Sequence, residues 1–280
     1  MKRFNHHIFY CFNILMQDNF MDKFVIKKSA AKSKRGLKDE SSGSTDFNKL
    51  DEEPRTKKRN ADQDTFHLTS DHFTWKRIQA ENLNCDYTSL FSKNEADDIF
   101  QQLEKDIVYF SGNLSQVMVY GKWHNVPRKQ VMYGDEGLHY TFSGITLSPK
   151  PWIPVLVHIK ERLQLATGHS FNFVLINRYK DGNDHIGEHR DDEKELVPQS
   201  PIASVSFGAC RDFIFRHKDA RCKNPMCHIQ PVKVELAHGS LLMMNYPTNV
   251  YWYHSLPVRK KVFSPRVNLT FRNISLESSK

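Results

Sequence analysis

The spacing of apolar residues separates a polar first quarter of the chain from a patterned remainder. Ser92–Glu95 (SKNE) is typical of a helix N-terminus, with serine as the N-cap and glutamate three residues later. The apolar residues that follow recur at helical spacing: Ala96, Ile99, Phe100, Leu103 and Ile107. A second helix is predicted from Pro154 to Ala166, ending before Gly168.

After Gly168 the pattern changes to short β-rich runs separated by turns. These runs are residues 171–179, 202–207, 212–216, 231–236, 240–244, 250–254 and 266–272. Helices first and many short strands afterwards predict a mainly β protein with flanking helices. We expect a double-stranded β-helix (jelly roll) core, formed by a single catalytic domain over residues 72–280.

Residues 1–71 lack this pattern, and we expect them to form a disordered basic tail. Basic clusters at 27–35 and 55–59 are typical of nuclear localisation signals, although a solvated charged tail explains either one alone. The apolar run 8–16 lacks the small-residue cleavage site of a secretory signal, so we interpret residues 1–20 as an extension upstream of Met21.

The formal net charge of +8 favours a polyanionic partner. Residues 1–70 carry 14 basic and 10 acidic side chains, and the remainder carries 26 and 22, so half of the excess lies in the folded part. Five cysteines indicate a reducing compartment, and no run predicts a membrane span. A zinc site at Cys222, Cys227 and His228 is disfavoured, because its spacing is loose and a fourth ligand is not evident.

The candidate chemistry centres on residues 184–192 (DHIGEHRDD). His189 and Asp191 are two residues apart, so in extended chain both side chains leave the same face. With His254 downstream they make two imidazoles and one carboxylate, the facial triad of non-haem Fe(II) oxygenases. Each histidine alone also fits an ordinary buried histidine, so the interpretation depends on the set.

The run 266–272 (RVNLTFR) adds a cosubstrate signal. Its period-two alternation places Arg266, Asn268, Thr270 and Arg272 on one face and apolar residues on the other. Charged groups rarely enter an interior unless they are paired. Two guanidinium groups on one inward face therefore suit a dicarboxylate such as 2-oxoglutarate.

From about Trp75 to the C-terminus, the sequence resembles the AlkB-type Fe(II)/2-oxoglutarate dioxygenases. The segments that carry the resemblance are 171–182 (FNFVLINRYKDG), 189–192 (HRDD), 204–212 (SVSFGACRD), 238–244 (HGSLLMM), 252–257 (WYHSLP) and 266–272. The resemblance implies Fe(II) bound by His189, Asp191 and His254. It implies 2-oxoglutarate bound by the following residues: Asn177, Tyr179, Arg266, Thr270 and Arg272.

The resemblance also implies DNA repair. The expected reaction is oxidative demethylation of 1-methyladenine and 3-methylcytosine in double-stranded DNA, releasing formaldehyde and succinate. One alternative is an RNA or single-strand demethylase, or a protein hydroxylase, of the same class. A catalytically silent DNA-binding adaptor is another, although the intact ligand set speaks against it.

Several residues are expected to contact the DNA. Tyr140, Thr141 and Phe142 resemble a lid that stacks on a flipped base, whereas an aromatic pair at this spacing is otherwise more typical of a core. Asp192 and Glu193 are candidates for reading the base edge. Val119, Tyr120 and Gly121 resemble a finger that fills the gap in the duplex, with tyrosine where we associate phenylalanine with the family. The backbone contacts expected are Lys122, Arg128, Arg216, Lys218, Lys223, Arg259, Lys260 and Lys261.

In the tail, Lys23–Lys27 (KFVIK) resembles the short motif by which repair proteins dock on the sliding clamp PCNA. We therefore predict a monomer in the nucleus. Its expected partners are duplex DNA and PCNA, and no membrane partner is expected.

Overall fold

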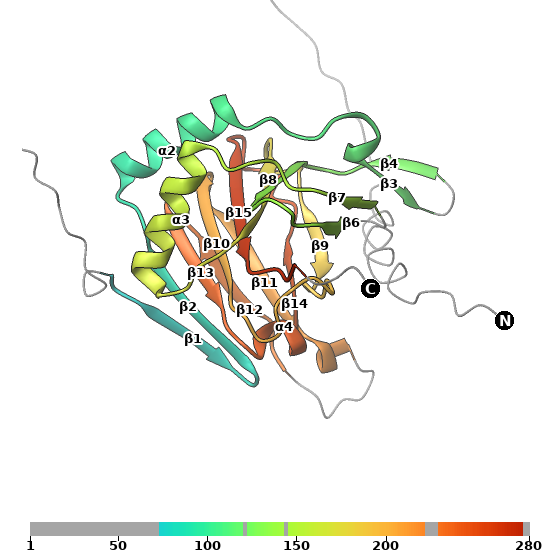
Figure 1. The fold of residues 1–280 in the computed structure, drawn as a ribbon. Helices are drawn as coiled ribbons and strands as arrows, with labels where there is room; N and C mark the ends of the chain where they lie inside the picture. The colour runs from blue at the N-terminus through green and yellow to red at the C-terminus, as the bar shows by residue number, and fades with distance from the viewer. Residues whose placement is uncertain (1–72, 120–121, 143–144, 222–228, 277–280) are drawn as a thin grey trace, which may run out of the picture. The chain divides into compact units, whose positions relative to one another are not determined.

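The structure is a computed structural model that describes residues 73–119, 122–142, 145–221 and 229–276 (Figure 1). Its larger sheet has seven strands, in the order β1 (Lys76–Ala80), β2 (Leu83–Ser89), β13 (Ser240–Met244), β10 (Ile202–Gly208), β15 (Arg266–Arg272), β8 (Phe173–Tyr179) and β5 (Lys129–Gly134). The smaller sheet has the order β12 (Val232–Leu236), β11 (Arg211–His217), β14 (Trp252–Leu256) and β9 (Ile186–His189). Long crossovers between antiparallel neighbours give the jelly roll that the sequence predicts.

Two hairpins stand apart from these sheets, β3 (Gln116–Val119) with β4 (Lys122–Asn125) and β6 (Tyr140–Phe142) with β7 (Ile145–Leu147). The helical elements are α2 (Lys93–Asp106), η2 (Gly112–Ser115), α3 (Pro154–Thr167), η3 (Lys218–Arg221) and α4 (Thr248–Tyr251). Among the described residues, no helix is both long and apolar enough to cross a bilayer.

Helices α2 and α3 begin and end as local chemistry dictates. The Ser92 hydroxyl accepts from the Glu95 N–H, and the Glu95 carboxylate accepts from the Ser92 N–H at 2.9 Å, so the capping box forms. Helix α3 has Pro154 in its first turn and ends at Gly168, whose φ of 73° lies in the left-handed region.

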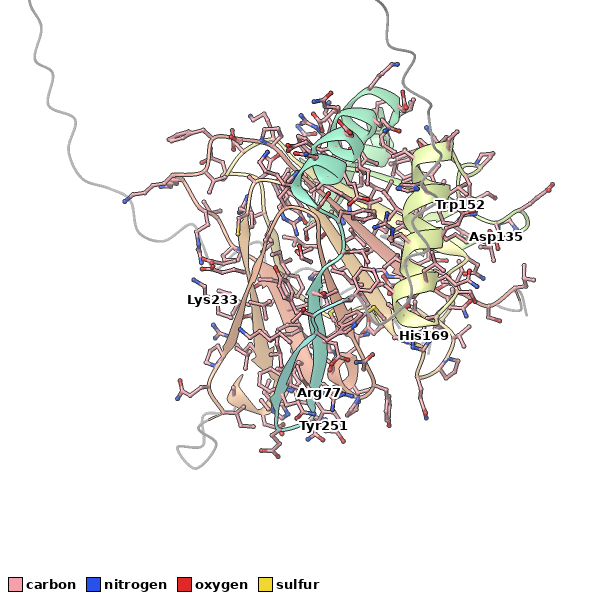
Figure 2. All side chains as sticks on the ribbon, turned by 90° about the vertical axis from the view of Figure 1, so that its left-hand side faces the viewer. Arg77, Asp135, Trp152, His169, Lys233 and Tyr251 are labelled. Carbon is pink, nitrogen blue, oxygen red and sulfur yellow. The ribbon has the colours of Figure 1, made fainter. Side chains whose placement is uncertain are left out.

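The core has two main parts, one on each face of the larger sheet. The apolar residues of β15, including Val267 and Phe271, pack with α2 and α3 on one face. Trp152, just before α3 (Figure 2), has its ring nearly parallel to that of Phe271. On the other face, Leu242 packs with Phe215 and Trp252 of the smaller sheet. The polar residues of β15 therefore point between the two sheets, as its alternation predicts.

Part of the predicted pattern was wrong or incomplete. Residues 250–254 were predicted as a strand, but Thr248–Tyr251 form α4 and the strand runs over Trp252–Leu256. Strands β1 and β2 were not predicted, because β2 (LNCDYTS) alternates only weakly and depends on its pairing with β13.

Candidate active site

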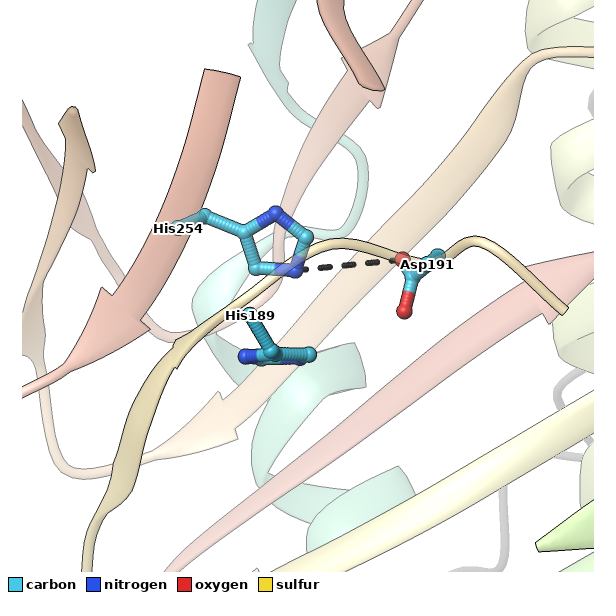
Figure 3. Close-up of side chains that lie close together, drawn as sticks. All are labelled: His189, Asp191 and His254. Carbon is cyan, nitrogen blue, oxygen red and sulfur yellow. Dashed lines mark ion pairs between the residues drawn. The ribbon is translucent and has the colours of Figure 1, made fainter. Parts of the chain in front are cut away.

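A cluster of two histidines and one aspartate lies between the sheets (Figure 3). His189 on β9 and His254 on β14 are register partners, with ring centroids 4.3 Å apart. Asp191 follows the end of β9, and its Oδ2 lies 3.8 Å from His254 Nε2. One potential ligand atom from each residue lies within 4.8 Å of the others. The strand pairing thus brings together residues that are 65 positions apart.

Both imidazoles are held in the neutral form that binds metals. His189 Nδ1 lies 2.9 Å from the Gly187 carbonyl, which only accepts, so this nitrogen carries the proton and leaves Nε2 unprotonated. Burial is the main cause that lowers the pKa of His254 to about 3, and the neighbouring His189 contributes to the same shift. Burial also lowers the pKa of His189.

Asp191 is an ionised carboxylate held on one side by the protein. Burial opposes its ionisation, but Arg272 and the two imidazoles hold its pKa below the ordinary value. Arg272 Nη2 donates to Asp191 Oδ1 at 2.5 Å. The other oxygen, Oδ2, is buried and has no hydrogen-bond partner among the described residues. This orphaned oxygen next to two neutral imidazoles fits a divalent cation.

Arg266 marks the other end of β15. It is 1% exposed, and its Nη2 donates to the Ser206 hydroxyl (2.8 Å) and to Asn268 Oδ1 (2.9 Å). Burial lowers its pKa to about 10, and within the described parts of the chain no carboxylate forms an ion pair with it. Its Nε has no partner there either. A buried cation without a countercharge is costly and therefore fits an anionic ligand.

Aromatic and amide groups from the neighbouring strand surround Arg266. Tyr179 and Asn177 lie opposite Arg266 and Asn268 in the pairing of β8 with β15. The guanidinium of Arg266 lies 5.6 Å from the centroid of the Tyr179 ring. Thr270 Oγ1 accepts from Asn268. All the residues expected to bind 2-oxoglutarate thus come from two adjacent strands.

The chain matches the 2OG-Fe(II) oxygenase superfamily over residues 86–272. It belongs to this family. It is 62% identical over 256 residues to a Bos taurus protein named DNA oxidative demethylase ALKBH2. The aligned region covers 91% of this chain and 92% of the relative. The Homo sapiens protein of the same name is 70% identical over 203 residues, 72% of this chain and 78% of the relative. A Mus musculus alpha-ketoglutarate-dependent dioxygenase, alkB homolog 3, is 39% identical over 68% of this chain and 65% of the relative.

The oxygenase therefore uses Fe(II) and 2-oxoglutarate, and the described site fits both. His189, Asp191 and His254 would hold the metal. The uncompensated Arg266 suits one carboxylate of the dicarboxylate.

The surroundings of Tyr140 differ from those expected of a residue that stacks on a flipped base. Instead of presenting an open stacking surface, it is fully buried and stacks on Phe173 at 4.6 Å. Its hydroxyl accepts from Arg272 Nη1 at 2.6 Å and donates to the Glu193 carboxylate. The core interpretation holds for this ring, because burial and two polar partners fix it. The side chain of Phe142 lies outside the described residues, and Thr141 is exposed.

The two candidate acids for base reading have different surroundings. Burial raises the pKa of Glu193. Arg272 acts against this shift, and Asp191 adds to it. Asp192 is exposed, with its carboxylate 3.9 Å from Arg190, and lines a cavity of about 340 Å³ that also touches Asp191 and Tyr246. Glu193 lines the same cavity and is half-buried, so Asp192 is the more accessible of the two acids.

Of the predicted finger, the structure describes the backbone of Val119, which ends β3 and pairs with Lys122 at the start of β4. Tyr120, Gly121 and the side chains of Val119 and Lys122 lie outside the described residues, as do Lys223 and the disfavoured zinc candidates Cys222, Cys227 and His228.

Arg128 differs from its predicted role as a contact to the DNA backbone. Its Nε donates to Asn177 Oδ1 at 3.0 Å, and Gln130 donates to the same oxygen at 2.9 Å. The guanidinium therefore lies on the cofactor-binding face, because β5 pairs with β8 and carries it there.

The basic residues form two separate groups. Arg216 pairs with Glu188 (2.8 Å) and Lys218 lies over the Tyr251 ring, both at the end of β11. Arg259 pairs with Asp212 (2.7 Å) near the start of β11, next to Lys260 and Lys261. The two groups are attached to β11 at Asp212 and Arg216, which are four residues and therefore about 13 Å apart.

Arg211 was not predicted. It is 2% exposed, and its guanidinium donates to the carbonyls of Asp181 (3.1 Å), Asp184 (3.0 Å) and Pro257 (2.7 Å). It therefore ties the β8–β9 loop to the segment after β14. Its only sequence signal was an arginine at the start of an apolar strand.

Proposed function

We propose that the oxygenase repairs DNA by oxidative demethylation, with 1-methyladenine and 3-methylcytosine in double-stranded DNA as substrates. The observation that carries the proposal is the set of half-buried His189 and buried Asp191 and His254, in the same interior as Arg266. The names of the bovine and human relatives support DNA as the substrate.

The residues of the site have separate tasks in this reaction. When bound, Fe(II) and 2-oxoglutarate would reduce dioxygen, so that one oxygen atom enters succinate as 2-oxoglutarate loses carbon dioxide and the other hydroxylates an N-methyl group. The hydroxymethyl group then leaves the base nitrogen as formaldehyde, and the nitrogen recovers its hydrogen or its ring lone pair. Asn177, Tyr179, Arg266, Thr270 and Arg272 bind the dicarboxylate, and Arg272 also keeps Asp191 ionised and oriented. The apolar walls between the sheets exclude water.

On the substrate side, Asp192 and Phe142 are proposed to contact the flipped base, with Glu193 as a second acceptor. A base outside the duplex needs an edge partner and a stacking surface. Tyr140 acts through Arg272 and Glu193, as a positioning residue. The basic groups at the two ends of β11 are proposed to hold phosphates, and Lys223 is proposed to do so as well.

The hairpin turn at Val119, Tyr120 and Gly121 is proposed as the wedge that fills the gap. Base–aromatic stacking contributes about 1–3 kcal/mol, so Tyr120→Ala should slow repair of a duplex at least fivefold and repair of a single strand little. Tyr120→Phe is the matched control and should retain duplex repair. Equal losses of Tyr120→Ala on both substrates would show a structural role.

The tail, residues 1–71, is proposed to be disordered and to direct the oxygenase, a monomer, to the nucleus and to PCNA. A peptide spanning residues 21–30 should bind PCNA, whereas one with Phe24 and Ile26 replaced by alanine should not. Absence of binding at high micromolar peptide would reject the clamp partner and leave the enzymatic proposal unaffected.

One assay tests the enzymatic proposal. Duplex oligonucleotides with a single 1-methyladenine or 3-methylcytosine should release formaldehyde only when Fe(II) and 2-oxoglutarate are both present. The same lesion in a single strand and in RNA measures the sister activities. Binding of DNA without any formaldehyde release would favour the silent adaptor instead.

A further inference from the structure

Asp191 lies where the pairing of β9 with β14 has ended. The last paired residue of β9 is His189, opposite His254, and Asp191 follows two residues later on a loop (Figure 3). Asp191 is 3% exposed, so its backbone N–H and carbonyl need partners that the strand pairing no longer supplies. The position of its carboxylate beside the two imidazoles therefore depends on whatever holds this part of the backbone.

The side chain of Asn249 on α4 supplies both partners. Its Oδ1 accepts from the Asp191 N–H at 3.1 Å, and its Nδ2 donates to the Asp191 carbonyl. Because a backbone N–H only donates and a carbonyl only accepts, the two bonds fix which way the Asn249 amide faces. One side chain thus takes the place of a neighbouring strand as the hydrogen-bonding partner of Asp191.

The residue before Asp191 is tied to the same segment. Arg190 Nη1 donates to the Val250 carbonyl at 2.8 Å, and the Arg190 guanidinium lies 4.8 Å from the centroid of the Tyr253 ring. Helix α4 leads directly into β14, which carries His254. The loop that carries Asp191 is therefore docked on the segment that carries His254, so the two ligands are held relative to each other.

A cavity on one side of this loop makes the contact necessary. Asp191 and Asn249 both line the cavity of about 340 Å³, together with Asn245. A loop that borders a cavity is not confined by packing on that side. Arg272 holds the carboxylate of Asp191, with 2.5 Å between Nη2 and Oδ1, whereas Asn249 holds the backbone. The two contacts restrain opposite ends of one ligand.

We infer that Asn249 is a positioning residue of the metal site. It holds the Asp191 backbone so that Asp191 Oδ2, 3.8 Å from His254 Nε2, stays beside the two imidazoles. Groups that orient metal ligands through hydrogen bonds typically contribute about 10–100-fold to metal affinity. The inference rests on the metal ligands of the proposed function and is independent of its DNA substrate.

The test is titration of the metal-free protein with Mn(II), followed by electron paramagnetic resonance. Asn249→Leu keeps the approximate size of the side chain and removes both hydrogen bonds, so the Mn(II) affinity should fall about tenfold or more. The matched control is Asn245→Leu. Asn245 lines the same cavity, but its Nδ2 donates to Asp86 Oδ2 at 2.7 Å and not to the ligand loop. This control should change the Mn(II) affinity by no more than about twofold.

Hydrogen exchange separates positioning from a general loss of stability. In the metal-free wild type the Asp191 amide should be protected, because Asn249 accepts its proton. In Asn249→Leu this amide should exchange about fivefold faster or more, whereas Asn245→Leu should leave its rate unchanged. Urea denaturation of both variants shows whether their overall stabilities are comparable.

Wild-type Mn(II) affinity in Asn249→Leu, or an equal loss of affinity in Asn245→Leu, would overturn the inference. If Asn249→Leu does not fold, the wild type still decides, because rapid exchange of its Asp191 amide would contradict the contact. Failure of the proposed ligand set is distinguishable, since Asp191→Ala would then bind Mn(II) as the wild type does. Absent formaldehyde release by a wild type that binds Mn(II) would concern the DNA substrate alone.

Discussion

The two ends of strand β15 carry buried arginines in opposite electrostatic situations. Arg272 contacts Asp191 at 2.5 Å and lies 3.9 Å from Glu193, and these carboxylates together with Tyr140 raise its pKa in spite of burial. Within the described part of the chain, Arg266 has only neutral hydrogen-bond acceptors, Ser206 and Asn268, and burial lowers its pKa to about 10. One arginine is thus satisfied by the protein, and the other retains an unmet need for an anion.

This difference separates structural from ligand-binding charge within one strand. Removing one partner of a buried ion pair strongly destabilises the folded protein. Removing a buried charge that has no partner instead removes the free-energy cost of its desolvation. Arg272 therefore supports Asp191, whereas Arg266 lacks a countercharge among the described residues, which fits its proposed binding of 2-oxoglutarate. The following predictions run from the largest expected effect to the smallest.

Asp191→Ala should remove formaldehyde release from methylated duplex completely. The substitution deletes the anionic ligand and leaves Arg272 with Glu193 as its remaining ion-pair partner. Titration of the purified variant with Mn(II), used in place of Fe(II), should show no binding where the wild type binds. Near-normal release that a chelator still inhibits would mean that Asp191 is not a ligand.

Arg272→Met should lower the free energy of unfolding of the metal-free protein by about 3–5 kcal/mol, because Asp191 is left buried and unpaired. Arg266→Met should leave it unchanged or raise it by about 1–4 kcal/mol. Urea denaturation of both variants measures the difference. Similar destabilisation by the two substitutions would break the comparison.

Arg266→Ala should raise the 2-oxoglutarate requirement at least tenfold, because charge-assisted hydrogen bonds contribute about 1.5–3 kcal/mol. The rise of Tm that 2-oxoglutarate gives to the wild type should shrink accordingly. Arg266→Lys is the matched control, and it should recover part of the affinity through its charge without the bidentate geometry. An unchanged titration would locate the carboxylate elsewhere.

Tyr140→Phe and Ser206→Ala compare the neutral partners of the two arginines. Tyr140→Phe leaves Arg272 Nη1 and one Glu193 oxygen without their partner, at a cost of about 1–3 kcal/mol in unfolding free energy. Ser206→Ala should cost about 0.5–1.5 kcal/mol, because Asn268 still accepts from the same nitrogen of Arg266. Thermal unfolding in the absence of ligand decides the order, and the reverse order would contradict the assignment.

The sequence by itself determined the features that depend on local spacing. The capping box at Ser92, the alternation of β15 and the two-residue spacing of His189 and Asp191 were all readable, because a helix or strand fixes which side chains share a face. The metal ligands followed from residue type and spacing, and the resemblance added the remaining residues of the cofactor site.

Only the tertiary structure decided what each polar group touches. Asp191 and Arg272 are 81 residues apart, and Arg211 binds carbonyls up to 46 residues away, so no local pattern relates them. Tyr140 became a core residue and Arg128 turned toward Asn177 because neighbouring strands, not sequence neighbours, surround them. Burial and electrostatic compensation arise from packing between distant segments, and they alone distinguish an arginine that supports the site from one that awaits a ligand.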